Sequence, residues 1–179
     1  MIFYAHLNRK HEIMSNNRLF LLNESKNLAM EGRYKEALEM VNQLLLTISD
    51  DLDGLRLKGN ILDLEVSVEN IEFPEHERKA KLAMAQKCYE RILELDPNNV
   101  LALIDLGDYW QNRTYFKQSL DYYNQALNLL KNNHFYLSLE DEFIEAFMGK
   151  KEVLQKMNKE PELNICQKEE KAILSRLPR

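Results

Sequence analysis

Carboxylates at the spacing of a calcium loop follow the first repeat-like segment of the chain. Counted from Ser49, the residues Asp51, Asp53 and Gly54 fall at positions three, five and six of the twelve-residue loop that wraps Ca²⁺. The first and last positions need oxygen ligands of high charge, but they hold Ser49 and Asn60. We therefore interpret this stretch as a capped connection between two helices and expect no metal there.

The other residues that could do chemistry are scattered. No histidine lies four residues from another, which is the spacing of a metal pair on one helix face. The four are His6, His11, His76 and His134. Cys88 and Cys166 lie far apart, outside any CxxC motif, and are expected to be core thiols. We find no glycine-rich phosphate loop or nucleophile motif, so we predict a chain that is not an enzyme and needs no cofactor or metal.

The charge balance also excludes some partners. The chain has 24 Lys and Arg against 29 Asp and Glu, a net charge of −5, which is the wrong sign for binding a phosphate backbone. No apolar run is long enough to span a bilayer, and the apolar start Met1–Ala5 is too short for an export signal. We expect a cytoplasmic protein that binds neither nucleic acid nor membrane. With only five Gly and four Pro in 179 residues, one domain of long helices is favoured.

An internal repeat provides the elements that must position any functional residue. Ala85, Tyr89 and Ile92 stand at i, i+4 and i+7, which is one face of a helix. The same pattern of small, aromatic and small residues returns 34 residues later, as Ser119, Tyr123 and Ala126. A fixed period of this length is typical of repeat proteins built from helical hairpins.

The best copy of the repeat, residues 100–133, resembles the tetratricopeptide repeat family. Its matching framework positions are Leu103, Leu106, Gly107, Trp110, Phe116, Ser119, Tyr123 and Ala126. The closing proline of the family pattern is replaced by Lys131. The resemblance implies an all-α solenoid of helix-turn-helix units in a right-handed superhelix. Its small residues are expected where helices cross, and its aromatic residues between the helices.

Residues 1–179 are predicted to form a single domain with units at 18–51, 52–99 and 100–133. The second unit carries a 14-residue insertion near 63–80, which we expect to lengthen both arms of its hairpin about equally, with Phe73-Pro74 at the tip. Its apolar residues either pack within the hairpin or form a docking surface.

The C-terminal part, residues 134–179, fits the repeat only weakly. Phe147 and Leu154 stand at plausible first-helix positions. Pro161 suits the first turn of a helix, and the residues after it carry only a narrow apolar stripe. We expect a degenerate fourth repeat that ends in a capping helix, since terminal units of an array must be polar on the outside.

In this family, the inner helices of successive units line a groove that receives peptides or extended protein segments. The family's clamp for the terminal carboxylate of chaperone tails needs Lys, Asn and Arg at set positions. Those positions hold Leu22, Lys26, Leu57, Leu101 and Asp105. The clamp is absent, so such tails are not expected as partners.

The groove positions of this chain define a different candidate site. They are Leu19, Leu22 and Lys26 in the first unit, Asp53, Arg56, Asn60 and Asp63 in the second, and Ile104, Asp105, Asp108 and Gln111 in the third. Acids outnumber bases in this set, which predicts a protein or peptide partner with a basic and apolar segment. The alternative is an inner face that is simply solvated.

The leading prediction is therefore an interaction module or adaptor. A second hypothesis is a homo-oligomeric scaffold that docks through Ile2–Leu7 or the long hairpin. A third is a secretion-type chaperone of similar size and architecture.

Met14-Ser15-Asn16-Asn17 reads like a natural start, which makes residues 1–13 a candidate upstream extension.

Overall fold

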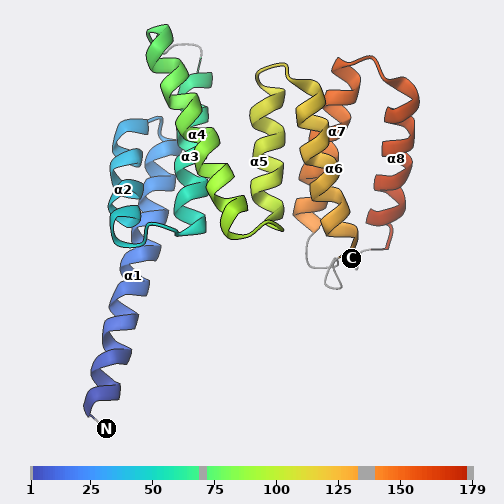
Figure 1. The fold of residues 1–179 in the computed structure, drawn as a ribbon. Helices are drawn as coiled ribbons and strands as arrows, with labels where there is room; N and C mark the ends of the chain where they lie inside the picture. Colours follow the sequence, from blue (N-terminus) through green and yellow to red (C-terminus); the bar gives the residue numbers. More distant parts are fainter. Residues whose placement is uncertain (1, 69–71, 133–139, 177–179) are drawn as a thin grey trace. The chain divides into compact units, whose positions relative to one another are not determined.

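The computed structural model describes residues 2–68, 72–132 and 140–176, with side chains from residue 15 onward. Every regular element in this part of the chain is an α-helix, which confirms the all-α prediction (Figure 1). None of the described helices is long and apolar enough to cross a membrane. The chain divides into two compact units, Met1–Leu95 and Asp96–Arg179, which we call unit 1 and unit 2 and describe separately.

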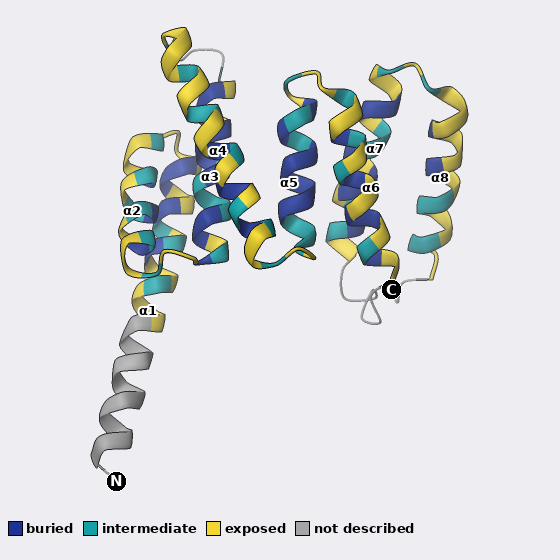
Figure 2. Ribbon diagram, viewed as in Figure 1, coloured by how far each residue is buried: buried dark blue, intermediate teal, exposed yellow. Residues whose placement is uncertain are grey.

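Each unit consists of two helical hairpins. Unit 1 holds α1 (Ile2–Met30), α2 (Tyr34–Thr47), α3 (Leu52–Ser67) and α4 (Glu75–Leu95). Unit 2 holds α5 (Val100–Gln111), α6 (Phe116–Asn132), α7 (Glu140–Lys156) and α8 (Glu160–Leu174). Within each unit every helix packs on the next, and the first helix also touches the third. The buried residues line the inner sides of these helices (Figure 2).

Three of the hairpins share one turn geometry. The residue two places before the second helix has a positive φ: Gly32 (76°), Thr114 (62°) and Asn158 (54°). In the first of these turns, Arg33 N–H donates to Leu28 O at 2.9 Å, and Gly32 N–H donates to the carbonyl of Ala29 at 3.0 Å. The same two hydrogen bonds recur in the other two turns, and together they form a Schellman motif, which ends a helix and turns the chain back.

Small residues allow the helices of a hairpin to cross closely. Ser25 and Ala37 are fully buried at the α1–α2 crossing, where Ser25 Oγ donates to Ala37 O at 2.8 Å. At the α5–α6 crossing, Ser119 Oγ donates to Gly107 O at 2.8 Å. The serine stands on the first helix of one hairpin and on the second helix of the other. Both hairpins therefore keep a hydrogen bond from a serine hydroxyl to a backbone carbonyl of the facing helix, although the donor lies on opposite helices.

Two buried tyrosines fill the space beside glycines, as the repeat pattern predicted. A Cβ at Gly59 would lie 2.6 Å from the ring of Tyr89, and one at Gly107 would lie 2.5 Å from the ring of Tyr123. Gly149 on α7 faces Tyr123 in the same way, so this ring lies between glycines of two helices. Trp110, which is half-buried, packs edge-on against two neighbouring tyrosines.

The inserted hairpin is extended unevenly. α3 continues eight residues past Gly59, whereas α5 ends four residues past the equivalent Gly107. α4 begins ten residues before Ala85, but α6 begins only three before Ser119, so the second arm takes the expected half of the insertion, whereas the first arm is lengthened by about four residues and the rest lies in the connection. Residues 69–71 lie outside the described part.

The extended part of the α3–α4 hairpin packs on itself. Lys81 Nζ pairs with Glu65 Oε2 at 2.8 Å and lies 5.0 Å from the centre of the Phe73 ring. Val66 is buried within the same hairpin. These contacts across the two arms support the first of the two alternatives for this segment, packing within the hairpin.

The stretch that resembles a calcium loop serves as a helix cap. Asp51 Oδ1 accepts from Gly54 N–H at 2.8 Å and so caps the N-terminus of α3. The Arg18 guanidinium on α1 donates to Asp51, whose side chain is 5% exposed, and to Asp53 Oδ2 at 2.6 Å. This pairing joins α1 to α3 and brings one cation to both carboxylates.

The two cysteines are free and buried, as expected of core thiols. Burial raises the pKa of Cys88 and of Cys166, so neither is a reactive thiolate at neutral pH.

Candidate ligand cleft

The shared turn sets a common register for the first helix of each hairpin. Lys26 lies six residues before Gly32, and Asp108 lies six before Thr114. In the fourth hairpin, Glu152 lies six residues before Asn158. Glu145, Met148 and Gln155 follow the same rule, at the places of Leu101, Ile104 and Gln111. These four residues of α7 therefore stand in the fourth hairpin where Leu101, Ile104, Asp108 and Gln111 stand in the third.

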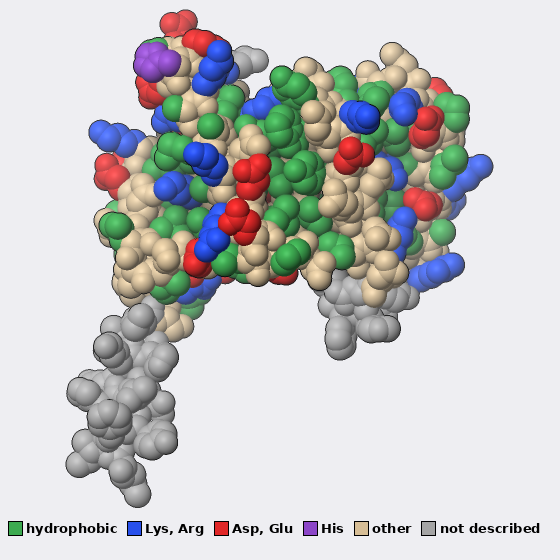
Figure 3. Space-filling model, viewed as in Figure 1, with side chains coloured by type: hydrophobic (Ala, Val, Ile, Leu, Met, Phe, Trp, Pro, Cys, Tyr) green, Lys and Arg blue, Asp and Glu red, His purple; other side chains and the backbone are tan. Residues whose placement is uncertain are grey.

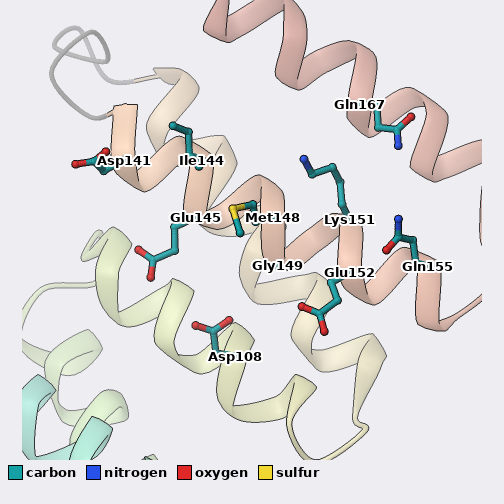
Figure 4. A pocket seen from close by; sticks show the side chains of 10 residues that line it. All are labelled: Asp108, Asp141, Ile144, Glu145, Met148, Gly149, Lys151, Glu152, Gln155 and Gln167. Atoms are coloured by element: carbon teal, nitrogen blue, oxygen red, sulfur yellow. The ribbon is translucent and has the colours of Figure 1, made fainter. Parts of the chain in front are cut away.

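In unit 2 these positions line a cleft with a volume of about 680 Å³. Its lining comes from α5, α7 and α8, and comprises Asp108, Asp141, Ile144, Glu145, Met148, Gly149, Lys151, Glu152, Gln155 and Gln167. Figure 4 shows Asp108 on α5 and Glu145 and Glu152 on α7 directed toward the space between these helices. The volume is in the range of pockets that hold small or peptide-like ligands.

The charge of the cleft is strongly negative. It contains four carboxylates, from Asp108, Asp141, Glu145 and Glu152, and a single cation. That cation, Lys151, donates to both carboxylate oxygens of Glu170 on α8 at 2.7 Å. Its charge is thereby compensated by a residue that does not line the cleft.

Asp108 is held in place by a neutral group. The hydroxyl of Tyr123, a fully buried residue of α6, donates to Asp108 Oδ1 and also to Gln111 Oε1 at 3.2 Å. Burial and the nearby Asp108 charge raise the pKa of Tyr123, so the hydroxyl keeps its proton throughout the physiological range. A hydroxyl donor orients the carboxylate without cancelling its charge.

The neighbours of Glu152 favour its ionised form. Lys156, one turn further along α7, donates to this carboxylate and lowers its pKa, and a hydrogen bond from Gln111 adds to the effect. The ion pair with Lys156 has an N–O distance of 2.7 Å and lies on an exposed surface, where such pairs contribute little to stability.

The cleft also offers apolar surface. Met148 is 59% exposed, which is unusual for a large hydrophobic residue of a helix in a packed array. Ile144, one turn earlier on α7, is half-buried. A flexible thioether can adapt its shape to a bound side chain.

The groove residues expected in unit 2 differ in their exposure in the structure. Asp108 lines the cleft. Gln111 is buried and bonds to Tyr123, which places it beneath the cleft surface. Ile104 is fully buried, and Asp105 is 7% exposed. Ile104 thus belongs to the core, because the inner face of α5 is covered there, and it cannot contact a ligand.

The expected groove residues on α3 of unit 1 are largely engaged in the structure. Asp53 pairs with Arg18, and Asn60 Oδ1 accepts from the Tyr89 hydroxyl at 2.7 Å. Asp63 is 9% exposed, and Arg56 is half-buried.

The three expected groove residues on α1 remain open to solvent. Leu19 is 50% exposed, Lys26 is exposed and Leu22 is half-buried. Elsewhere on unit 1, acidic and basic side chains adjoin each other on the face drawn in Figure 3. Arg91 and Asp50 of this unit form an ion pair with an N–O distance of 3.0 Å.

Several of the sequence-based hypotheses fall outside the described side chains. They concern Ile2–Leu7, the candidate extension 1–13, His6, His11 and His134. The described His76 is exposed at the start of α4. Sequence reasoning did not identify Glu145, Met148, Glu152 and Gln155, because their register follows from the turn at Asn158, which the structure shows.

Comparisons with known proteins add limited information. No family model matches the chain. A stretch of 65 residues, 36% of this chain, is 38% identical to human protein O-mannosyl-transferase TMTC3, and it covers 6% of that protein's length. Among solved structures, MamA AMB-1 is similar over 92% of this chain and all of that chain, with 16% identity and a TM-score of 0.41. MamA 41-end from Desulfovibrio magneticus RS-1 is similar over 86% of this chain and 98% of that chain, with 16% identity and a TM-score of 0.27.

Proposed function

We propose that this chain is a protein-interaction module, and that the cleft of unit 2 binds a basic segment of a partner protein. The observation that carries this proposal is the acidic lining of the cleft. Four carboxylates line it, and its lysine is bound by Glu170. A concave surface of one sign attracts a ligand of the opposite sign and raises its rate of association.

The fold supports binding, because rigid hairpins hold the cleft. The Tyr123 ring lies between Gly107 and Gly149 and its hydroxyl fixes Asp108, so the carboxylate is oriented before a ligand arrives. Such preorganisation reduces the entropy lost on binding. The carboxylates, amides and thioether of the lining suit recognition of a charged side chain with an apolar neighbour.

On unit 1 we retain a smaller proposal. Leu19, Leu22 and Lys26 form a partly apolar contact face on α1, because these residues are exposed or half-buried and no ion pair of Lys26 is described. We assign no charge preference to this face, since on the neighbouring α3 Asp53 is paired with Arg18 and Asp63 is buried.

The proposal is tested by the affinity of a labelled lysine-rich peptide for the full-length chain, measured by fluorescence anisotropy. Glu145→Lys reverses one exposed charge in the cleft and should weaken binding about tenfold at low salt. The matched control is Asp121→Lys, an exposed reversal on α6 away from the cleft, which should change the affinity little. Equal effects of the two reversals, or binding that is insensitive to salt, would overturn the proposal.

A further inference from the structure

We infer, building on the proposed function, that Gln111 is a positioning residue of the cleft. Its buried amide is held by the Tyr123 hydroxyl on one side and orients the Glu152 carboxylate on the other. The proposed function concerns the charge of the lining. The inference concerns a neutral residue that lies beneath the lining and acts through a residue that belongs to it.

The Tyr123 hydroxyl decides which end of the Gln111 amide serves Glu152. Gln111 Oε1 accepts from this hydroxyl at 3.2 Å, which leaves the Nε2 amino group as the donor of the side chain. An ionised carboxylate only accepts hydrogen bonds, so it needs this end of the amide and not the oxygen. Gln111 does form a hydrogen bond with Glu152. The hydroxyl therefore selects the amide orientation that suits the carboxylate.

Packing fixes the two inner members of this hydrogen-bonded chain. Tyr123 is fully buried with its ring against glycines of α5 and α7, and Gln111 is 7% exposed. Hydrogen bonds that are shielded from water hold their partners more firmly than exposed ones do. The same hydroxyl also donates to Asp108 Oδ1. One buried hydroxyl on α6 thus orients a carboxylate on α5 directly and a carboxylate on α7 through Gln111.

The equivalent tyrosine of unit 1 faces an amide and a carboxylate in the opposite order. Asn60 and Asp63 stand one and four residues after the crossing glycine of α3, as Asp108 and Gln111 do on α5. Each tyrosine hydroxyl donates to the first residue of its pair. In unit 1 the carboxylate is the buried member, whereas in unit 2 the amide is buried and the carboxylate lines the cleft. Only the order in unit 2 provides a buried amide beneath a cleft carboxylate.

The ion pair of Glu152 with Lys156 does not replace this role. Lys156 makes the largest contribution to the lowered pKa of Glu152, through an N–O contact of 2.7 Å. Both side chains of this pair are exposed, and exposed pairs are weakened by water and salt. Gln111 approaches from another helix and is buried, so it fixes the direction of the carboxylate, while the lysine mainly contributes charge.

Gln111→Met tests the role of the amide, because it keeps the length and neutral charge of the side chain. Glu152 then loses a donor, so its pKa should rise, as measured from the carboxyl ¹³C shift in the full-length chain and assigned with Glu152→Gln. The affinity for the labelled lysine-rich peptide should fall about threefold by fluorescence anisotropy. The matched control is Gln125→Met, an exposed amide on α6, which should change neither value.

Tyr123→Phe tests whether the hydroxyl acts through Gln111. Without this donor the Gln111 amide is free to rotate, so its hydrogen bond to Glu152 weakens but is not lost. The pKa of Glu152 should therefore rise in this variant too, but by less than in Gln111→Met. A tyrosine that only filled space would leave the pKa of Glu152 unchanged.

The possible outcomes separate this inference from the proposed function. An unchanged pKa of Glu152 in either Gln111→Met or Tyr123→Phe would overturn the inference, and so would an unchanged affinity in Gln111→Met. If Glu145→Lys still weakens peptide binding in that case, the proposed function stands. If Glu145→Lys has no effect on binding, the proposed function fails, and the inference that builds on it fails as well. Unchanged Trp110 fluorescence in each variant shows that unit 2 has kept its fold, because Trp110 is the only tryptophan of the chain.

Discussion

Units 1 and 2 are built on the same framework but use their acidic residues differently. Both have a first hairpin with a Schellman turn and a serine hydrogen bond at the helix crossing. Both also have a buried tyrosine whose hydroxyl donates to the residue after the crossing glycine, Asn60 or Asp108. The packing rules of the repeat are therefore met twice with different side chains.

The difference lies in what compensates the carboxylates. In unit 1, Arg18 pairs with both Asp51 and Asp53 and so joins two helices. In unit 2, the available cation Lys151 pairs with Glu170 instead, which leaves the cleft acidic. The contrast shows that acidic composition alone does not make a binding surface. What matters is the balance of acidic and basic side chains that the fold brings to one surface.

The largest expected effect tests the framework of unit 2. In Gly149→Ala the new methyl group meets the buried Tyr123 ring, which has no space to move. We expect a loss of about 3 kcal/mol in the free energy of unfolding, measured with urea and followed by Trp110 fluorescence. Gly54→Ala in unit 1 is the control, since its Cβ would lie 3.1 Å from the flexible end of Leu44. A Gly149→Ala chain as stable as the parent would contradict this packing.

The next effect tests the internal use of charge in unit 1. Arg18→Met leaves the nearly buried carboxylate of Asp51 without its cation, and we expect a destabilisation of about 2 kcal/mol. Asp53 is largely exposed, so Asp53→Ala should cost less than about 1 kcal/mol. Urea unfolding followed by circular dichroism measures both. Equal costs would show that the pair with Asp51 is no more important than an ordinary surface pair.

Tyr123→Phe tests how the cleft is supported. Loss of the hydrogen bond to Asp108 should cost about 1 kcal/mol at neutral pH. Since the folded chain keeps the Tyr123 proton above pH 10, where an unfolded tyrosine releases it, stability should fall as the pH rises beyond that value. The variant should remove this part of the alkaline loss. An unchanged pH profile between pH 8 and 11 would argue against the raised pKa.

The smallest effect compares the turns of the two units. Thr114 adopts a positive φ that is costly for a β-branched residue, whereas Gly32 adopts it freely. Thr114→Gly should stabilise the chain by about 0.5 kcal/mol, and Gly32→Ala should destabilise it by about 1 kcal/mol. Thermal unfolding of both variants tests these opposite signs. If the unfolding temperatures of the two variants shifted in the same direction, the turns would not be equivalent.

Much of the framework could be predicted from the sequence, because helix crossings impose local rules. Ala37, Gly59 and Gly107 must be small, and the aromatic residues at fixed distances from them must be buried. The spacing of such residues is visible without a structure. It predicted the repeated hairpins and the burial of Tyr89 and Tyr123.

The candidate cleft could not be found in the same way. Asp53 and Glu145 are both acidic residues, and their sequence neighbours do not show which of them is paired. In the structure, Arg18 pairs with Asp53 although it lies 35 residues away in the sequence. α7 lacks the small residue of the family pattern at its expected place, so its register was hidden until the turn at Asn158 was known. Long-range pairing and turn geometry decide which acidic residues are available, and neither is a local property of the sequence.

The central claim is that the cleft of unit 2, and not the α3 face of unit 1, binds a basic segment. Two-dimensional amide NMR of the isotope-labelled chain, titrated with the lysine-rich peptide, tests it most directly. We predict saturable shift changes along α7 from Glu145 to Gln155 and at Asp108, with the amides of Asp53 to Asp63 unchanged. Changes centred on α3 instead, or no saturable change on α7, would contradict the claim.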